Sequence, residues 1–268
     1  MLACLCRVTI TPEMIGIAKQ VAVEAGKIAI ELRKRGVNAR TKGKETDLVT
    51  SGDIASEKKI LDVLKSKFPK HNFLSEESGI TDNHSQYTWI IDPIDGTSAY
   101  FSGLPMWAVS IGLLKDMKPY LGVAFLPDFD ELFWAEQNKG AYLNGRRIKV
   151  NSEASLAKSI VAFDFGYSDR VEEAKRTYLP LIDKVRYPPI LACSVYGMVN
   201  VAKGIFGGYV HRALVWDYAA TAAMVQEAGG KVTNFEGGEV NWKSPDRWID
   251  VVGTNGLLHS EILSLINK

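Results

Sequence analysis

An apolar run that ends in two closely spaced acids, within residues 89–97, constrains the fold of this chain more than any other feature. Residues 89–91 are typical of the end of a buried strand, and Asp92 and Asp95 follow with Pro93 between them. Two carboxylates held close at a strand end repel each other and lose hydration unless a cation lies between them. A hard divalent ion with oxygen ligands suits such a pair, so the segment predicts a metal site.

The residues around the two acids support the same interpretation. Pro93 fixes its own backbone angle and favours a turn at Ile94 and Asp95, so that both carboxylates can face one point beyond the strand. Gly96 lets the backbone approach a ligand, and Thr97 adds a hydroxyl. An ordinary surface turn uses the same residue types, however, so the motif alone leaves both interpretations open.

Two further acidic segments bear on this choice. Glu76 and Glu77 follow a short apolar strand, and Asp217 stands at a predicted helix start between aromatic residues. Taken alone, Asp217 is explained as a helix cap, and the two glutamates are explained as a solvated pair. Taken together with Asp92 and Asp95, all of them are better explained by a shared metal site.

Composition excludes several classes of protein. The 268 residues suffice for one large domain or two modest ones, and 46% hydrophobic with 24% charged residues is typical of a globular protein. A net charge of +1 argues against direct nucleic-acid binding and against a membrane partner. The first residues lack the features of a secretory signal, so we expect a cytoplasmic protein. Three cysteines, Cys4, Cys6 and Cys193, argue against a disulfide framework.

The first half of the chain predicts two helices and then a run of strands. The helices span residues 11–36 and 54–68, and a basic loop lies between them at 36–46. Strands are predicted at residues 71–75, 87–91, 107–114, 120–126, 131–136 and 140–143, with a hairpin turn at Asn144 and Gly145. This pattern predicts an antiparallel or mixed sheet covered by the two helices.

The second half of the chain predicts alternating strands and helices. Strands are expected at residues 159–163, 231–234 and 249–254, and helices at 171–184, 195–203, 217–228 and 257–266. A soft boundary near residues 151–155 divides the chain into an N-terminal half, residues 1–152, and a C-terminal half, residues 153–268. We expect the two halves to form one compact catalytic unit.

Three segments carry a family resemblance: residues 76–78, residues 89–97, and residues 216–230 with their glycine pair at the end. Together, in this order and spacing, they resemble the inositol monophosphatase family of magnesium-dependent, lithium-sensitive phosphatases, and the similarity covers nearly the whole chain from about Thr11. The resemblance implies an α/β (α+β) fold, the layered α-β-α-β-α sandwich of the inositol monophosphatase and fructose-1,6-bisphosphatase type. It also implies a homodimer with the active site between the two sheet-containing halves.

The resemblance further implies ligands for two to three Mg²⁺ ions. Glu76, Asp92 and the carbonyl of Ile94 would bind one ion. A second ion would be bound by Asp92, Asp95 and Asp217. A third ion, bound more weakly, would depend on Glu76.

The implied catalytic residues are Glu76, Asp53 and Thr97, because Asp53 matches the family's aspartate that pairs with this threonine. Lys42 falls at the position of a family lysine near the phosphate. The implied substrate-binding set is Lys42, Ile94, Asp95, Gly96, Thr97 and Asp217.

Phosphate-ester chemistry gives an independent reason for such a site. Hydrolysis concentrates negative charge on the phosphoryl oxygens and on the leaving alkoxide, which paired magnesium ions neutralise while they lower the pKa of a bound water. A hydrogen bond from Thr97 to Asp53 would orient that water and accept its proton, so no covalent intermediate is needed. Backbone N–H groups of residues 95–97 would hold phosphate oxygens if a helix begins there.

The segments expected to recognise the alcohol part of the substrate differ from the family pattern. Family members that hydrolyse inositol phosphate usually carry an acid about seven positions before the last metal aspartate, where this chain has residues 208–212. Residues 188–194 replace a second family stretch. His211 and Arg212 could instead face a more anionic substrate, or could lie in a solvated loop.

Three functions follow from these observations. The first is a magnesium-dependent phosphomonoesterase acting on inositol monophosphate or a related polyol or sugar phosphate. The second is fructose-1,6-bisphosphatase, 3'-nucleotidase or histidinol-phosphatase activity. The third is a non-catalytic, partner-binding role on the same scaffold, which the intact acidic ligands disfavour. In the enzymatic readings the partner is a small phosphorylated substrate.

Overall fold

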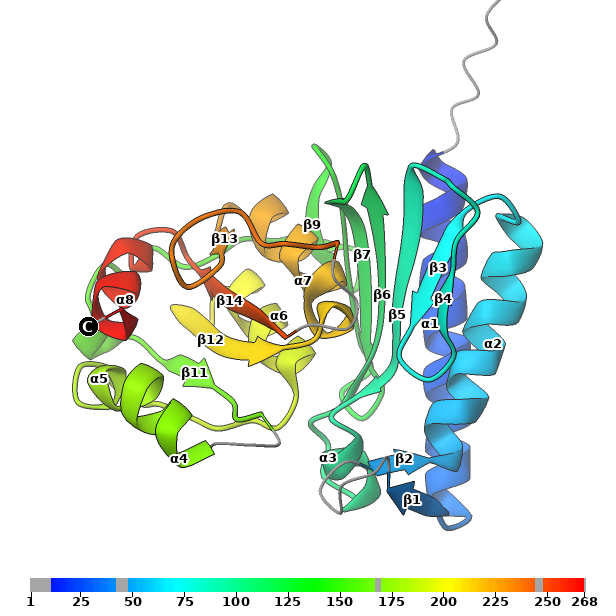
Figure 1. The fold of residues 1–268 in the computed structure, drawn as a ribbon, viewed down its shortest axis with the longest axis horizontal. Coiled ribbons are helices and arrows are strands. Elements are labelled where there is room, and N and C mark those ends of the chain that lie inside the picture. The colour runs from blue at the N-terminus through cyan, green and yellow to red at the C-terminus, as the bar shows by residue number, and fades with distance from the viewer. Residues whose placement is uncertain (1–10, 42–47, 167–169, 244–247, 268) are drawn as a thin grey trace, which may run out of the picture.

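Helices and sheets alternate in layers across the molecule (Figure 1). The computed structural model describes residues 11–41, 48–166, 170–243 and 248–267. Two long helices cover one face of a large sheet, a second pair of helices fills the space between that sheet and a smaller one, and short helices cover the far side of the smaller sheet. The predicted α-β-α-β-α sandwich is therefore confirmed.

The large sheet has eight strands in the order β10-β9-β8-β7-β6-β5-β3-β4. All of its neighbours pair antiparallel except β3 and β5, which pair parallel, so the predicted mixed sheet is also confirmed. Its strands are β3 (Asn72–Ser75), β4 (Gly79–Thr81), β5 (Tyr87–Asp95), β6 (Ala108–Lys115), β7 (Lys118–Leu126), β8 (Glu131–Glu136), β9 (Gly140–Leu143) and β10 (Arg146–Ile148).

The smaller sheet has four strands in the order β11-β12-β14-β13, and a separate two-stranded ribbon, β1-β2, lies near the start of the second helix. The strands of these two sheets are β1 (Ala39–Thr41), β2 (Leu48–Thr50), β11 (Val161–Phe163), β12 (Gly208–Ala213), β13 (Lys231–Thr233) and β14 (Ile249–Thr254). The larger sheet thus comes from the predicted N-terminal half and the smaller one from the C-terminal half. The division at residues 1–152 and 153–268 stays a prediction.

The helices are α1 (Thr11–Lys34), α2 (Ser51–Lys67), α3 (Thr97–Phe101), α4 (Arg170–Glu173), α5 (Leu179–Ile182), α6 (Ser194–Ala202), α7 (Val215–Glu227) and α8 (His259–Ile266), with a 3₁₀ turn at Leu156–Lys158 and a π turn at Ala174–Tyr178. None of the described helices is long and apolar enough to cross a bilayer. Helix α1 packs through small residues, since Ala18, Ala22, Ala25 and Ala29 are fully buried against the large sheet and α2.

Helix α7 lies unusually close to the large sheet because two paired glycines face it. Gly112 of β6 and Gly122 of β7 are direct neighbours in the sheet register. A Cβ atom at Gly122 would stand 2.0 Å from the carbonyl oxygen of Ala220, and one at Gly112 would stand 2.8 Å from the amide nitrogen of the same residue. Only glycine allows this backbone approach. The contact fixes where the start of α7, and therefore Asp217, lies relative to the sheet.

Four predicted segments differ from the structure. Helix α2 begins at Ser51 rather than at residue 54, because Thr50 and Asp53 form a capping box at its N-terminus. Strand β5 does not end at Ile91 but continues through Pro93 to Asp95, and the expected turn is a bulge between Asp92 and Asp95.

The other two differences are strands where loops were expected. Residues 39–41 form β1, which pairs with β2 in a ribbon that the sequence does not signal. Residues 208–212 belong to β12, so the solvated-loop interpretation of His211 is wrong. Cys4 and Cys6 lie outside the described residues.

Candidate active site

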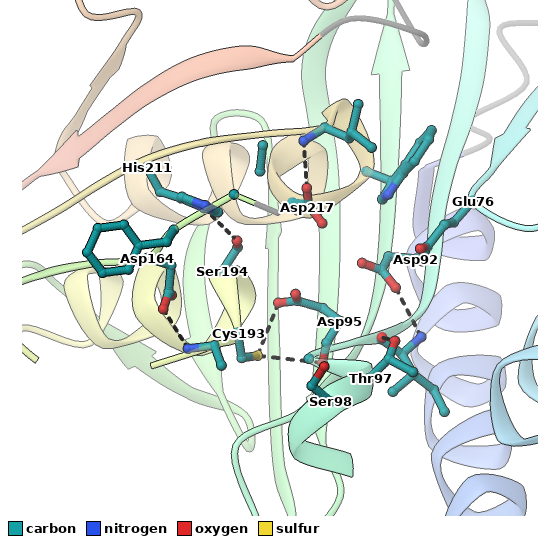
Figure 2. A pocket seen from close by; sticks show the side chains of 18 of the residues that line it. Glu76, Asp92, Asp95, Thr97, Ser98, Asp164, Cys193, Ser194, His211 and Asp217 are labelled. Atoms are coloured by element: carbon teal, nitrogen blue, oxygen red, sulfur yellow. Dashed lines mark hydrogen bonds between the residues drawn. The ribbon is translucent and has the colours of Figure 1, made fainter. Parts of the chain in front are cut away.

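Four acidic residues from three separate elements converge on one cavity (Figure 2). Asp92 and Asp95 come from the end of β5, Asp217 from the first turn of α7, and Glu76 from the loop after β3. Because β3 and β5 are parallel, their carboxyl ends lie together, and the Glu76 amide donates to the carbonyl of Ile91 at 3.2 Å. The cavity has a volume of about 270 Å³.

Three of the predicted metal ligands are close enough to share an ion. Carboxylate oxygens of Asp92, Asp95 and Asp217 all lie within 4.8 Å of one another. Asp92 and Asp95 are buried, whereas Asp217 is partly buried. Three carboxylates and no nitrogen or sulfur ligand form the all-oxygen donor set that suits Mg²⁺ or Ca²⁺ rather than a soft metal. The residues present therefore fit a hard divalent cation.

The electrostatics of the cluster point to the same need for a cation. Burial raises the pKa of Asp92 well above its usual range, and the carboxylates of Glu76 and Asp95 raise it further. Burial also raises the pKa of Asp217, with Asp95 and Glu76 adding to the effect. The pKa of Asp95 rises to about 6, again mainly because it is buried. Among the described residues, burial is the largest cause of all three raised pKa values, and the charges that raise them further are those of other acids.

Asp95 is held in place by donors on the neighbouring helix α6. Its Oδ2 atom accepts a hydrogen bond from the Val195 amide at 2.5 Å and one from the Cys193 thiol at 3.0 Å. Cys193 caps α6 by accepting from the Tyr196 amide. These two donors fix the orientation of the Asp95 carboxylate. Sequence reasoning gave Cys193 no role, because a lone cysteine carries no spacing signal.

A buried acid on α2 holds the loop that carries Glu76. Glu57 accepts hydrogen bonds from the backbone amides of Glu77 and Ser78, at 3.0 and 3.1 Å. The hydroxyls of Ser75 and Ser78 also donate to it. Glu57 was missed from the sequence, yet a signal exists: it lies four residues after Asp53, so both acids share the inner face of the helix.

The predicted pair of Thr97 and Asp53 lies within hydrogen-bond distance. The Thr97 hydroxyl is 3.1 Å from Oδ1 of Asp53 and 3.0 Å from the carbonyl oxygen of Ile94, and it can donate to either. The other Asp53 oxygen accepts from the backbone amide of Thr50 at 2.8 Å. The capping box of α2 therefore fixes the orientation of the Asp53 carboxylate.

Helix α3 begins at Thr97, directly after the metal-ligand strand. Its N-cap residue Gly96 has a positive φ of 84°, and a Cβ atom there would stand 2.8 Å from the carbonyl oxygen of Met106. Both the conformation and the space therefore require glycine at this position. The first-turn amides of a helix have no partner within the helix, so those of Thr97 and Ser98 are available at the cavity wall.

The remaining predicted residues are placed as follows. Ile94 and Gly96 line the cavity. Lys42 lies outside the described residues. Arg212 points away from the cavity: its side chain is exposed and forms an ion pair with Asp250 at 3.4 Å, so it does not face the substrate as one alternative had it. His211 has the opposite orientation, because successive strand residues face opposite sides of the sheet, and it lines the cavity.

The second wall of the cavity comes from the smaller sheet and the segment before α6. Asp164 is buried and accepts the backbone amides of Leu191 and Ala192, at 2.8 and 2.6 Å. Ala192 has a φ of 56°, a conformation that these hydrogen bonds stabilise. Asp164 thus orders the segment that leads to Cys193. Sequence reasoning singled out the segment, residues 188–194, but not the acid that holds it.

Comparison with known proteins identifies the family. The model of the inositol monophosphatase family matches residues 11–268. The fructose-1,6-bisphosphatase/inositol-1-monophosphatase of Aquifex aeolicus is 35% identical over 94% of each chain, and inositol monophosphatase 3 of Solanum lycopersicum is 36% identical over 92% of this chain and 96% of its own. The crystal structure of the extragenic suppressor protein suhB from Bartonella henselae superposes with a TM-score of 0.88 at 29% identity, covering 96% of this chain and 99% of the other. The chain therefore belongs to the inositol monophosphatase family and is a phosphoric monoester hydrolase.

Proposed function

We propose that this protein is a Mg²⁺-dependent phosphomonoesterase that hydrolyses inositol monophosphate, or a related polyol or sugar phosphate, with a metal-activated water. The observation that carries the proposal is the approach of Asp92, Asp95 and Asp217 to within 4.8 Å of one another in a cavity. Their raised pKa values mean that the cluster is unfavourable when fully ionised unless cations bind to it.

The ligands would be shared between two principal ions. Glu76, Asp92 and the Ile94 carbonyl would hold one ion, and Asp92, Asp95 and Asp217 would hold the other, with Glu76 also supporting a weaker third. When bound, the ions would neutralise the phosphoryl charge and lower the pKa of a bound water. The hydrogen bonds of Glu57 and of Cys193 and Val195 keep two of these acids in fixed positions, which limits the entropy lost when an ion binds.

Thr97 and Asp53 are placed to act on the attacking water. With its proton donated to Asp53, the Thr97 hydroxyl oxygen can accept a proton of a water that lies in the cavity. That arrangement orients the oxygen lone pair of the water towards the phosphorus, and Asp53 is the base available to take up the proton. The free amides at the start of α3 would hold phosphoryl oxygens, and we assign Lys42 a role near the phosphate from the family pattern.

The substrate class rests on the relatives and on the cavity. The Aquifex aeolicus relative is named as both a fructose-1,6-bisphosphatase and an inositol-1-monophosphatase, which makes fructose 1,6-bisphosphate the second candidate substrate. The volume of about 270 Å³ suits one small phosphate ester. Lithium inhibition and a homodimer are further inferences that we draw from family membership alone.

Phosphate release from a panel of esters tests the proposal. The panel contains inositol 1-phosphate, fructose 1,6-bisphosphate, a 3'-nucleotide, histidinol phosphate and phenyl phosphate, each assayed with Mg²⁺, with EDTA and with Mg²⁺ plus Li⁺. We expect Mg²⁺-dependent release from inositol 1-phosphate that Li⁺ suppresses. Phosphate release that persists in EDTA, or no release from any ester of the panel, would contradict the proposed chemistry.

A further inference from the structure

His211 has one ring nitrogen that the fold leaves without a partner. The residue lies in β12, is 6% exposed and lines the cavity. Its Nδ1 atom lies 2.8 Å from the Tyr218 hydroxyl, 3.2 Å from that of Ser194 and 3.4 Å from that of Tyr209. Its Nε2 atom is buried and makes no hydrogen bond to any described residue. Buried polar atoms are rarely left unpaired, so an unpaired one on a side chain that lines a cavity points to a ligand.

The hydrogen-bond partners decide which nitrogen carries the proton. Tyr209 donates its hydroxyl proton to Asp164 at 2.8 Å. The Tyr218 hydroxyl is the closest of the three hydroxyls around Nδ1, at 2.8 Å, and a neutral imidazole that accepts from it at Nδ1 carries its proton on Nε2. Burial lowers the pKa of His211 to about 3, so the ring is neutral. With Tyr218 as the donor to Nδ1, the unpaired Nε2 atom is an N–H donor.

The lining of the cavity restricts what this donor can meet. Phe165, Trp216 and Trp248 line the same cavity and offer aromatic faces to a ring or carbon chain. Asp164 lies on the wall near His211, and Figure 2 shows both across the cavity from Asp92 and Thr97. A neutral donor beside a buried acid favours an uncharged oxygen as its acceptor over a second phosphate.

We propose that His211 is a specificity-determining residue, whose Nε2–H donates a hydrogen bond to a hydroxyl oxygen on the alcohol part of the substrate. This assignment rests on the proposed function and names the residue that recognises the alcohol part of its substrate. Tyr218 and Ser194 act through His211 as positioning residues, because they fix the ring and its proton. A polar group buried in a site discriminates against ligands that leave it unpaired.

Kinetics of His211→Leu against two probes test the proposal. Inositol 1-phosphate offers hydroxyls, whereas phenyl phosphate offers none. We expect kcat/KM for inositol 1-phosphate to fall about tenfold, since one hydrogen bond is lost, with little change for phenyl phosphate. His211→Gln keeps a side-chain N–H donor and should recover part of the loss. Arg212→Gln, on the opposite face of the same strand, is the matched control and should leave both values unchanged.

Other outcomes overturn the assignment in distinguishable ways. An equal loss on both probes would make His211 a structural residue, and no loss on either would leave it without a role. A loss confined to fructose 1,6-bisphosphate would make a second phosphate, not a hydroxyl, the acceptor. If the wild-type protein releases no phosphate with Mg²⁺ from inositol 1-phosphate, phenyl phosphate or fructose 1,6-bisphosphate, the proposed function fails, and this assignment fails with it.

A measurement on the wild-type ring tests the donor directly and needs no catalytic turnover. Imidazole ¹⁵N–¹H correlation spectra report which nitrogen carries the proton. We expect the His211 signals of a neutral ring protonated at Nε2 from pH 5 to pH 8. A proton found on Nδ1 would make Nε2 an acceptor and would overturn the proposal even if His211→Leu loses activity.

Discussion

Hydrogen bonds from the protein hold two of the acids of the site in a fixed orientation. Asp95 has one oxygen held by Val195 and Cys193, and Asp217 has one oxygen held by the Leu214 amide at 2.7 Å. The orientation of each carboxylate is therefore set before an ion arrives. Ligands oriented in this way lose little conformational freedom on binding.

Replacing Asp217 by Asn should remove a metal ligand while the fold survives. The amide keeps the shape of the side chain and can still accept from Leu214, but it lacks the charge that binds the ion. We expect Mg²⁺-dependent kcat to fall at least about 100-fold, which is the upper end of the effect of removing an outer-shell partner. The control is Asp62→Asn on the exposed face of α2, where an ion pair with Lys58 is worth little.

Thermal unfolding distinguishes a lost ligand from a lost fold. Asp217→Asn should unfold at or above the wild-type temperature without metal, because it removes one charge from a group of buried acids. Near-wild-type turnover in this variant would show that Asp217 is not a metal ligand.

Two substitutions of Thr97 distinguish the role of its hydroxyl from that of its methyl group. Thr97→Ala removes the donor to Asp53, and we expect kcat to fall roughly 100-fold or more, as for other positioned proton-transfer groups. Thr97→Ser keeps the hydroxyl and should recover most of the rate with a similar KM. Steady-state kinetics of both variants provide the measurement. An active alanine variant would rule out the proposed role of the pair in orienting water.

At the scale of elements, the site depends on how closely helix α7 approaches the large sheet. Asp217 reaches the end of β5 because Gly112 and Gly122 leave room for the backbone of Ala219 and Ala220. Without that approach, the first turn of α7 would lie further from Asp92 and Asp95. The glycine pair in the sheet is therefore a requirement of the metal site as well as of the core.

Gly122→Ala should disturb both stability and activity. The new methyl group would stand 2.0 Å from a backbone carbonyl oxygen of α7, so the helix must move away from the sheet. We expect a loss of about 1–3 kcal/mol in the free energy of unfolding, the usual range for overpacking, together with weaker Mg²⁺ binding as Asp217 shifts. Urea unfolding and Mg²⁺ titration of the activity measure the two effects.

A glycine in open space supplies the control for this variant. Gly16 lies in α1, and a Cβ atom there meets nothing within 4 Å. Gly16→Ala should raise stability by roughly 0.5–1 kcal/mol, since alanine favours a helix, and should leave metal binding unchanged. If Gly122→Ala behaves in the same way, the close approach of α7 is not needed for the site.

On the scale of the whole molecule, the acids lie where the two sheet-containing halves meet. The large sheet and α7 supply the carboxylates, and the smaller sheet supplies the opposite wall with His211 and Asp164. Apolar side chains of α6 and α7 fill the space between the sheets and hold these walls at a fixed separation. A cluster of acids in such an interior couples the stability of the protein to both pH and metal.

We expect the stabilisation by Mg²⁺ to grow as the pH rises from 5.5 to 8. Asp95 has a pKa raised to about 6, and those of Asp92 and Asp217 are also raised, so without metal the folded protein holds more protons than the unfolded chain. The contribution of these groups to stability is therefore present at low pH and is lost as the pH rises through the folded pKa values. Mg²⁺ competes with those protons and relieves the repulsion that follows their loss.

The gain in melting temperature with and without Mg²⁺, measured at both pH values, checks this expectation. At a Mg²⁺ concentration about 100 times Kd the gain corresponds to about 2.7 kcal/mol. Comparing the two states at each pH removes the contribution of histidines outside the cavity, such as His259, which is hydrogen-bonded to Thr233 and Thr254. Asp217→Asn should lose most of the gain, and a gain that does not depend on pH would contradict the coupling.

Patterns local in the chain predicted much of the fold. The apolar spacing from Thr11 to Lys34, the hairpin at Asn144 and Gly145 and the glycine stop after α7 all act over a few residues, so they can be read without a structure. The bulge that carries β5 through Pro93 could not be read in this way. Its pairing partner, β6, decides whether the segment turns or continues, and that contact is distant in the chain.

The chemistry of this protein was present in the sequence because carboxylates next to strand and helix ends have few other uses in such a combination. The relative positions of the side chains could not be predicted from the sequence, because they depend on contacts between residues far apart in the chain. Such contacts produce the hydrogen bonds of Glu57 and those that Val195 and Cys193 donate to Asp95. They also bury His211 while Arg212 faces solvent. Local sequence determined which groups are available, and only tertiary packing decided which of them lose water and face one another.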